Sequence, residues 1–160
     1  MFKKTLALVT LVLAMAFATA AFAAVPSKDY VAAAREEIPA AAVMFGYKED
    51  IKDGDVEIKF RDNDAFLTYE VKVDMATKKV LEVEIKGSNS ADSTTVVKTE
   101  ADIRNIILEA YPDAQNILIK LDRDGNKAHY EAHFATAKYL VEADLNPVTG
   151  AFVERELKYF

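Results

Sequence analysis

The sequence predicts an α+β fold made of two tandem repeats, each a helix followed by a four-stranded antiparallel meander, with the helices packed on one face of the sheet or sheets. Three observations lead to this prediction. Motifs recur in the same order about 72 positions apart. Apolar and polar residues alternate in several segments, as in half-buried antiparallel strands. Each group of such segments follows a segment in which apolar residues have helical spacing.

The recurrence is easiest to see in the turns. Lys52-Asp53-Gly54-Asp55 matches Arg123-Asp124-Gly125-Asn126, and Asp74-Met75-Ala76-Thr77 matches Asn146-Pro147-Val148-Thr149. Between the copies, residues 87–98 are rich in small and polar side chains, which is typical of a linker. We therefore expect repeats at 24–86 and 99–160. They could form separate lobes or join their sheets edge to edge.

Each copy is expected to begin with a short helix. In the second copy Thr99 is the predicted N-cap, and Asp102 is placed to accept a hydrogen bond from the Thr99 amide. In the first copy Ser27 is the predicted N-cap, and Pro39 limits the helix at its other end. Because such short helices are not stable alone, both are expected to cover a sheet.

The strands are predicted from strict alternation, and Asp-Gly and other polar turns separate them. A further strand is expected after each helix, near 42–48 and 116–122. The residues predicted to face the core are Val56, Ile58, Phe60, Leu67, Tyr69, Val71, Val73, Leu81, Val83 and Ile85 in the first copy, and Ala128, Tyr130, Ala132, Phe134, Tyr139, Val141, Ala143, Leu145, Val153 and Leu157 in the second.

The N-terminus has the order of a cleavable export signal. Lys3 and Lys4 precede an apolar run at 6–17, and small residues end at Ala21-Phe22-Ala23. We expect 1–23 to be a signal peptide that is cleaved after Ala23, so that the chain is periplasmic or secreted. No stable membrane insertion is expected after cleavage, because the apolar run is shorter than a membrane span.

The composition narrows the classes of partner and activity. Loss of Lys3 and Lys4 changes the formal charge from 20 − 26 = −6 to 18 − 26 = −8. An acidic surface repels phosphates, so the sequence predicts no nucleic-acid partner and favours a basic partner or a cation. The chain has no cysteine, which excludes disulfides and thiolate chemistry. Because it also lacks a nucleophile motif and a phosphate-binding loop, we predict a protein that is not an enzyme and has no cofactor.

These motifs together resemble the PepSY domain. The pattern is a helix, Ile-Pro or Tyr-Pro, a strand, an Asp-Gly turn, Tyr-Glu in a strand, and a final Val-Asp-x-x-Thr-x-x-Val-Leu. The last motif stands at 73–81 and, in altered form, at 145–153. The resemblance implies an exported protein that inhibits or regulates a secreted peptidase or another hydrolase. The tandem arrangement is also similar to the beta-lactamase inhibitor protein, which binds enzymes with the open face of a continuous sheet.

Candidate partner-binding residues lie in the second copy. Leu140 and Phe152 are predicted to point outward among charged residues, on the same face as His129, His133 and Glu154. Apolar residues near the centre of a polar face are typical of protein interfaces. Incidental exposure is the alternative, since single exposed apolar residues are common. Histidines would make binding sensitive to mildly acidic pH.

A second hypothesis is that the protein binds a small ligand or a metal ion in the cell envelope. His129, Glu131 and His133 share one face of a predicted strand, at a spacing of about 6.8 Å between neighbours. One metal ion could therefore be held by Glu131 with His129, or by Glu131 with His133. A solvated strand face is the alternative interpretation of the same residues.

Arg155 has a predicted structural role. It interrupts an otherwise apolar strand face. Its long side chain could pass along the apolar surface to reach solvent at the edge of the sheet. Alternatively, it could form a buried ion pair with Glu109 or Asp113 that fixes how the two copies pack.

Overall fold

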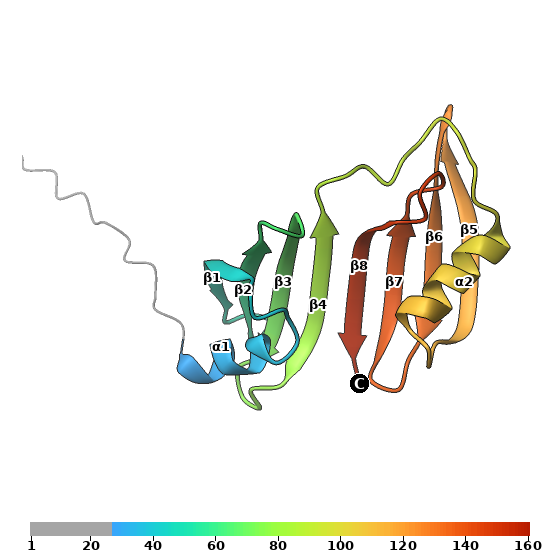
Figure 1. The fold of residues 1–160 in the computed structure, drawn as a ribbon. Helices are drawn as coiled ribbons and strands as arrows, with labels where there is room; N and C mark the ends of the chain where they lie inside the picture. Colours follow the sequence, from blue (N-terminus) through green and yellow to red (C-terminus); the bar gives the residue numbers. More distant parts are fainter. Residues whose placement is uncertain (1–26) are drawn as a thin grey trace, which may run out of the picture.

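The computed structural model describes residues 27–160, and the predicted signal peptide lies outside these residues. The described residues form two helices and eight strands, which are labelled in Figure 1. The helices are α1 (Lys28–Arg35) and α2 (Glu100–Ala110). The strands are β1 (Val43–Asp50), β2 (Asp55–Asp62), β3 (Leu67–Asp74), β4 (Val80–Gly87), β5 (Gln115–Asp124), β6 (Lys127–Ala135), β7 (Tyr139–Leu145) and β8 (Phe152–Tyr159).

All eight strands belong to one antiparallel sheet with the order β1-β2-β3-β4-β8-β7-β6-β5. The predicted fold class, α+β with two tandem helix-plus-four-strand repeats, is therefore wrong. The chain folds as one predominantly β structure, and its two described helices contain only 8 and 11 residues. Pairing of β4 with β8 satisfies backbone groups that two separate four-stranded sheets would leave unpaired at their edges.

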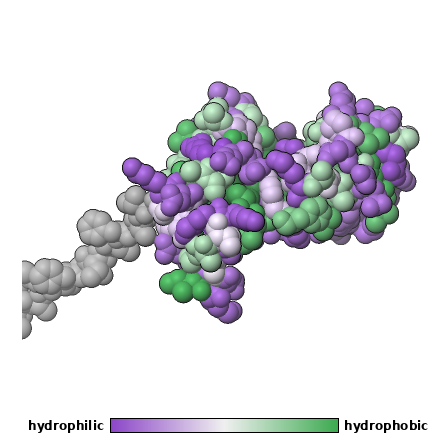
Figure 2. Space-filling view, turned by 90° about the horizontal axis from the view of Figure 1, so that it is seen from below, coloured by the Kyte–Doolittle hydropathy of each residue, from purple (hydrophilic) through white to green (hydrophobic). Residues whose placement is uncertain are grey.

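Both helices lie against the same face of the sheet (Figure 1), and both contribute to one hydrophobic core. Ala34 of α1 and Ile103 and Ile107 of α2 have no exposed surface. Side chains from β2, β3, β4, β6, β7 and β8, together with Ile38, Ala42 and Tyr111, complete this core. The outer surface seen from below is mostly hydrophilic, with small separate hydrophobic areas (Figure 2).

The predicted helix caps are confirmed. Thr99 Oγ1 accepts a hydrogen bond from the Asp102 amide at 3.2 Å, and Asp102 Oδ2 accepts one from the Thr99 amide at 2.8 Å. Ser27 caps α1 by accepting from the amide of Asp29 at 3.4 Å. These contacts satisfy amides that have no partner within the helix.

Alternation correctly predicts the core-facing residues of β2, where Val56, Ile58 and Phe60 are fully buried. It fails where the strand register shifts. A shift after Lys72 pairs Val73 with Val80, and Leu81, which was expected to face the core, is 42% exposed. A shift of one residue reverses the face on which a side chain lies, and sequence periodicity does not reveal where such a bulge falls.

The predicted linker, 87–98, packs against the second half of the sheet. Ser93 exchanges two backbone hydrogen bonds with Ala128, at 2.9 and 2.8 Å. The amide of Lys98 donates to the carbonyl oxygen of Pro147 at 2.8 Å. The connection between the two halves is therefore held against β6 and the β7–β8 turn instead of hanging free.

Candidate functional site

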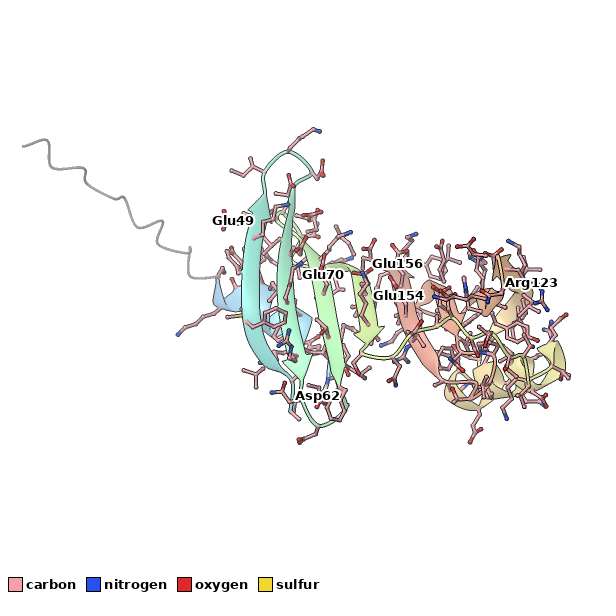
Figure 3. The ribbon with its side chains drawn as sticks, turned by 90° about the horizontal axis from the view of Figure 1, so that it is seen from above. Glu49, Asp62, Glu70, Arg123, Glu154 and Glu156 are labelled. Atoms are coloured by element: carbon pink, nitrogen blue, oxygen red, sulfur yellow. The ribbon has the colours of Figure 1, made fainter. Side chains whose placement is uncertain are left out.

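The face of the sheet opposite to α1 and α2 is covered by no described helix, and we call it the open face. Glu154 and Glu156, labelled in Figure 3, lie on the side of β8 away from α2. Four neighbouring strands bring six carboxylates together near the middle of this face. This acidic centre consists of Glu84 on β4, Glu154 and Glu156 on β8, Glu142 and Asp144 on β7, and Glu131 on β6.

Like charges lie directly opposite one another in the acidic centre. Glu156 pairs in register with Glu84 on one side and with Glu142 on the other. In the next row Glu154 lies opposite Asp144. Side chains at such positions have Cβ atoms about 4.5–5.5 Å apart, and like charges there are destabilising. The sheet therefore loses stability at the seam where its two halves join.

Lysines compensate only part of this charge. Lys86, Lys158 and Lys120 contact the acidic centre, with closest nitrogen–oxygen distances of 2.7, 3.2 and 3.8 Å. The formal balance of these lysines against the six carboxylates is 3 − 6 = −3. The net negative charge of the acidic centre would attract a cationic group, although the three lysines would oppose part of this attraction.

Two carboxyls of the acidic centre hold their protons more tightly than usual. Burial raises the pKa of Asp144, and the charges of Glu131 and Asp92 add to the effect while His129 opposes it. Burial and the neighbouring Glu84 carboxyl raise the pKa of Glu154. Each shift means that the ionised form is disfavoured in the folded protein, so a bound cation would stabilise it.

A small hollow lies within the acidic centre. Its volume is about 130 Å³, below the roughly 300–1,000 Å³ of pockets that enclose drug-sized ligands. The space suits the head group of one lysine or arginine side chain. Its lining is Glu131, His133, Glu142, Ala143, Asp144, Glu154 and Glu156.

Two exposed leucines lie beside the acidic centre. Leu118 on β5 is 70% exposed and Leu140 on β7 is 49% exposed. They line one hollow of about 240 Å³ together with His133, which pairs in register with Leu118. An apolar area next to charged groups provides both kinds of contact that protein interfaces use.

The predicted residues Leu140, His129, His133 and Glu154 all lie on the open face. His129 Nδ1 is 3.0 Å from the Asp92 carboxylate of the linker. His133 Nε2 is 3.0 Å from Glu131 Oε1. The sequence thus places these side chains on one surface, but it does not reveal their individual contacts.

The outward position predicted for Phe152 is wrong. A register shift pairs Phe152 with Leu145, and Leu145 is fully buried on the core face. The Phe152 ring packs against the core, with its centroid 6.0 Å from that of Tyr111. The bulge between Asp144 and Leu145 therefore turns this side chain away from the open face.

Arg155 lies on the core side, as predicted, opposite Ala143. Among the described residues it forms an ion pair with neither Glu109 nor Asp113. Its Nη1 donates to the hydroxyl of Tyr111 at 3.1 Å, and its guanidinium carbon lies 5.2 Å from the centre of the Phe152 ring. The side chain is thus held by an aromatic pocket and not by a buried charge.

Sequence interpretation missed Glu84, Leu118, Glu142, Asp144 and Glu156 as site residues. The four carboxylates fall on outward positions of alternating strands, whereas Leu118 lies in the apolar run Ile117-Leu118-Ile119, where alternation gives no signal. Alternation cannot show that Glu156 lies between two other glutamates, since that depends on which strands pair.

Within residues 27–160, no group of three or more histidine, aspartate or glutamate side chains is arranged to hold a metal ion. The same part of the chain contains no helix that is long and apolar enough to cross a membrane.

Comparisons with known proteins give little further information. No protein-family model matches the chain, and no curated protein matches it. A solved structure of a putative lipoprotein from Clostridium difficile 630 is 19% identical over 74% of this chain and 82% of that one, with a TM-score of 0.31. A likeness of this size identifies neither the fold nor the function.

Proposed function

We propose that the chain is an exported, non-catalytic protein-binding module whose open face binds a positively charged partner protein. The observation that carries this proposal is the position of Glu156 between Glu84 and Glu142. Such a row weakens the sheet, and lysine or arginine side chains of a partner would relieve the repulsion. Leu118 and Leu140 would supply apolar contact beside it.

The sequence adds two elements to this proposal. The predicted signal peptide supports export, so the partner would be met in the periplasm or outside the cell. The resemblance to PepSY domains supports a secreted peptidase or another hydrolase as the partner, with this chain as its inhibitor or regulator.

Binding of a small ligand or a metal ion at the acidic centre has less support. Of the two suggested pairs, Glu131 and His133 lie together at 3.0 Å, while His129 contacts Asp92 instead of Glu131. Within residues 27–160 no third ligand completes a metal site around the Glu131–His133 pair. The hollow in the acidic centre is also small for an organic ligand.

The test is affinity capture from the native exported fraction with three forms of the protein. One is the unchanged chain, and one carries Glu142→Gln, Glu154→Gln and Glu156→Gln. The matched control loses the same charge at exposed positions outside the acidic centre, through Glu36→Gln, Asp64→Asn and Glu109→Gln. Circular dichroism checks that all three forms are folded.

We expect the unchanged chain and the control to retain a basic protein that the first variant does not retain. Calorimetry with the purified partner should show the same difference, and raised salt should weaken the binding because exposed charges are screened. Equal retention by all three forms would contradict the proposed site.

A further inference from the structure

A separate hollow lies at one end of the sheet, beside the β2–β3 turn, the last residues of β2 and β4 and the first residues of β3. This end of the sheet is at the top of the first four strands in Figure 1. The volume of the hollow is about 420 Å³, within the range of small-ligand pockets. Its exposed lining is more apolar than polar. The lining residues are Arg61, Asp62, Asn63, Phe66, Leu67, Thr68, Lys86, Gly87 and Ser88.

Cationic groups line this hollow, in contrast to the acidic centre. Arg61 pairs in register with Thr68, and Thr68 pairs with Lys86. Since neighbouring strands are about 4.8 Å apart, two cationic side chains flank a hydroxyl across about 10 Å. Lys86 is already paired with two carboxylates, so Arg61 is the cation of this lining that has no carboxylate partner among the described residues.

The Arg61 guanidinium is available to an anion. Among the described residues it has no carboxylate partner, and its central carbon lies 4.9 Å from the centre of the Phe45 ring. Such stacking on an aromatic face orients a guanidinium and leaves its edge N–H groups free. Lys86 is shared, because its Nζ lies 2.7 Å from Glu84 and 3.4 Å from Glu154.

The carboxylate of Asp62 is engaged in the β2–β3 turn. Asp62 is buried, and its Oδ1 accepts hydrogen bonds from the amides of Asp64 and Ala65, both at 3.0 Å. These bonds build the β2–β3 turn. The wall of the hollow formed by this turn is therefore fixed by hydrogen bonds.

Phe66, at the end of the turn, has two unusual properties. Its φ is 55°, in the left-handed region that disfavours bulky side chains. Its side chain is 71% exposed, so burial in the core does not explain the choice of an aromatic residue. A glycine would adopt this backbone conformation without strain. Strained residues of this kind are often retained for binding.

We propose that this hollow binds a small carboxylate that carries an apolar chain. Its carboxylate group would lie between Arg61, Thr68 and Lys86. Its apolar chain would lie on Phe66 and Leu67 and could extend past Phe66 into an adjoining hollow of about 410 Å³. A fatty carboxylate and the C-terminus of an apolar peptide both have this chemistry.

The test uses decanoate as the probe and the whole protein as purified from the cells that produce it. Two-dimensional NMR should show decanoate shifting the amide signals of Phe66, Leu67, Gly87 and Ser88. Decanol has the same chain without the charge and should shift them much less. An acetylated dipeptide ending in leucine, compared with its amidated form, tests whether peptide ends are the source.

Two variants separate binding from folding. Arg61→Gln should weaken decanoate binding by about tenfold, the scale of losing one charged hydrogen bond. Phe66→Gly should also weaken it while leaving the melting temperature unchanged or higher, since it removes backbone strain. The control Lys120→Gln removes a cation from β5 and should leave decanoate binding unchanged.

Three outcomes would overturn the proposal. The first is that neither decanoate nor the free-carboxyl dipeptide shifts these amide signals at millimolar concentration. The second is that decanol binds as well as decanoate, which would show that Arg61 and Lys86 do not bind the carboxylate. The third is that both variants bind decanoate as the unchanged chain does. If only the dipeptide with a free carboxyl group binds, the proposal stands and peptide ends are the source.

Discussion

Replacing Glu156 with glutamine should make the protein more stable, whereas the same change at Glu57 should make it less stable. Both residues are glutamates near the middle of their strands, with side chains on the open face. Glu156 lies opposite Glu84 and Glu142, while Glu57 lies opposite Lys48 and Lys72. The two substitutions therefore remove the same charge from opposite electrostatic surroundings.

The expected magnitudes follow from these pairs. One directly opposite pair of charges contributes about 0.2–1 kcal/mol. Glu156→Gln removes two repulsions but also the ion pair with Lys158 at 3.2 Å, so we expect a net gain of about 0.5 kcal/mol. Glu57→Gln removes two attractions and the 2.9 Å contact with Lys59, so we expect a loss of about 1 kcal/mol.

Urea unfolding at neutral pH and low salt measures both changes in the free energy of unfolding. In thermal unfolding of a domain of this size, the corresponding shifts in melting temperature are about +2 °C for Glu156→Gln and about −4 °C for Glu57→Gln. Raised salt should reduce both, because the side chains are partly exposed. Destabilisation by Glu156→Gln, or equal effects of the two substitutions, would refute the view that the acidic centre costs stability.

Three further predictions concern single positions. Asp144→Asn should raise the free energy of unfolding at neutral pH, because burial raises the pKa of Asp144 and the folded protein disfavours its charge. This gain in stability should shrink as the pH falls through the raised pKa, because Asp144 then becomes protonated. A gain that is unchanged in acid would contradict this prediction. Gly150→Ala should destabilise the protein more than Gly54→Ala does. Both glycines have φ near 75°, but only at Gly150 would the added Cβ meet the Ile106 side chain. Thermal unfolding should show a loss of about 1 kcal/mol for Gly54→Ala, and an equal loss for both variants would exclude the effect of the Ile106 contact. Thr99→Ala should cost about 1 kcal/mol through loss of the α2 cap, and a loss of helix signal in circular dichroism at lower temperature would accompany it.

Local features were predicted well because neighbouring residues encode them. The Thr99–Asp102 capping box depends only on residues three positions apart, and the structure contains it. The alternation in β2 and β6 correctly separates buried from outward residues. Leu140 and Glu154 were placed on the open face for the same reason. The candidate site could be predicted to this extent, as a set of outward positions on known strands.

Features that depend on pairing between distant strands were not predictable. Phe152 and Leu81 were assigned to the wrong faces because register shifts lie near them, and no local pattern marks a bulge. The fold class was wrong because the two described helices are short and the structure is predominantly one β-sheet. The sequence also left the number of sheets open. Two copies of similar strand order are compatible with separate sheets or with one, and only the pairing of β4 with β8 decides between them.

The sequence by itself determined which segments form strands, where the helices begin, the acidic charge and the set of side chains that point outward. Each of these follows from residues a few positions apart, whose spacing and chemistry act locally. The tertiary structure alone decided that β4 and β8 join, and hence that Glu84, Glu156 and Glu142 form one row. Strand edges carry equivalent backbone hydrogen-bonding groups, so the choice of partner depends on packing across the whole sheet.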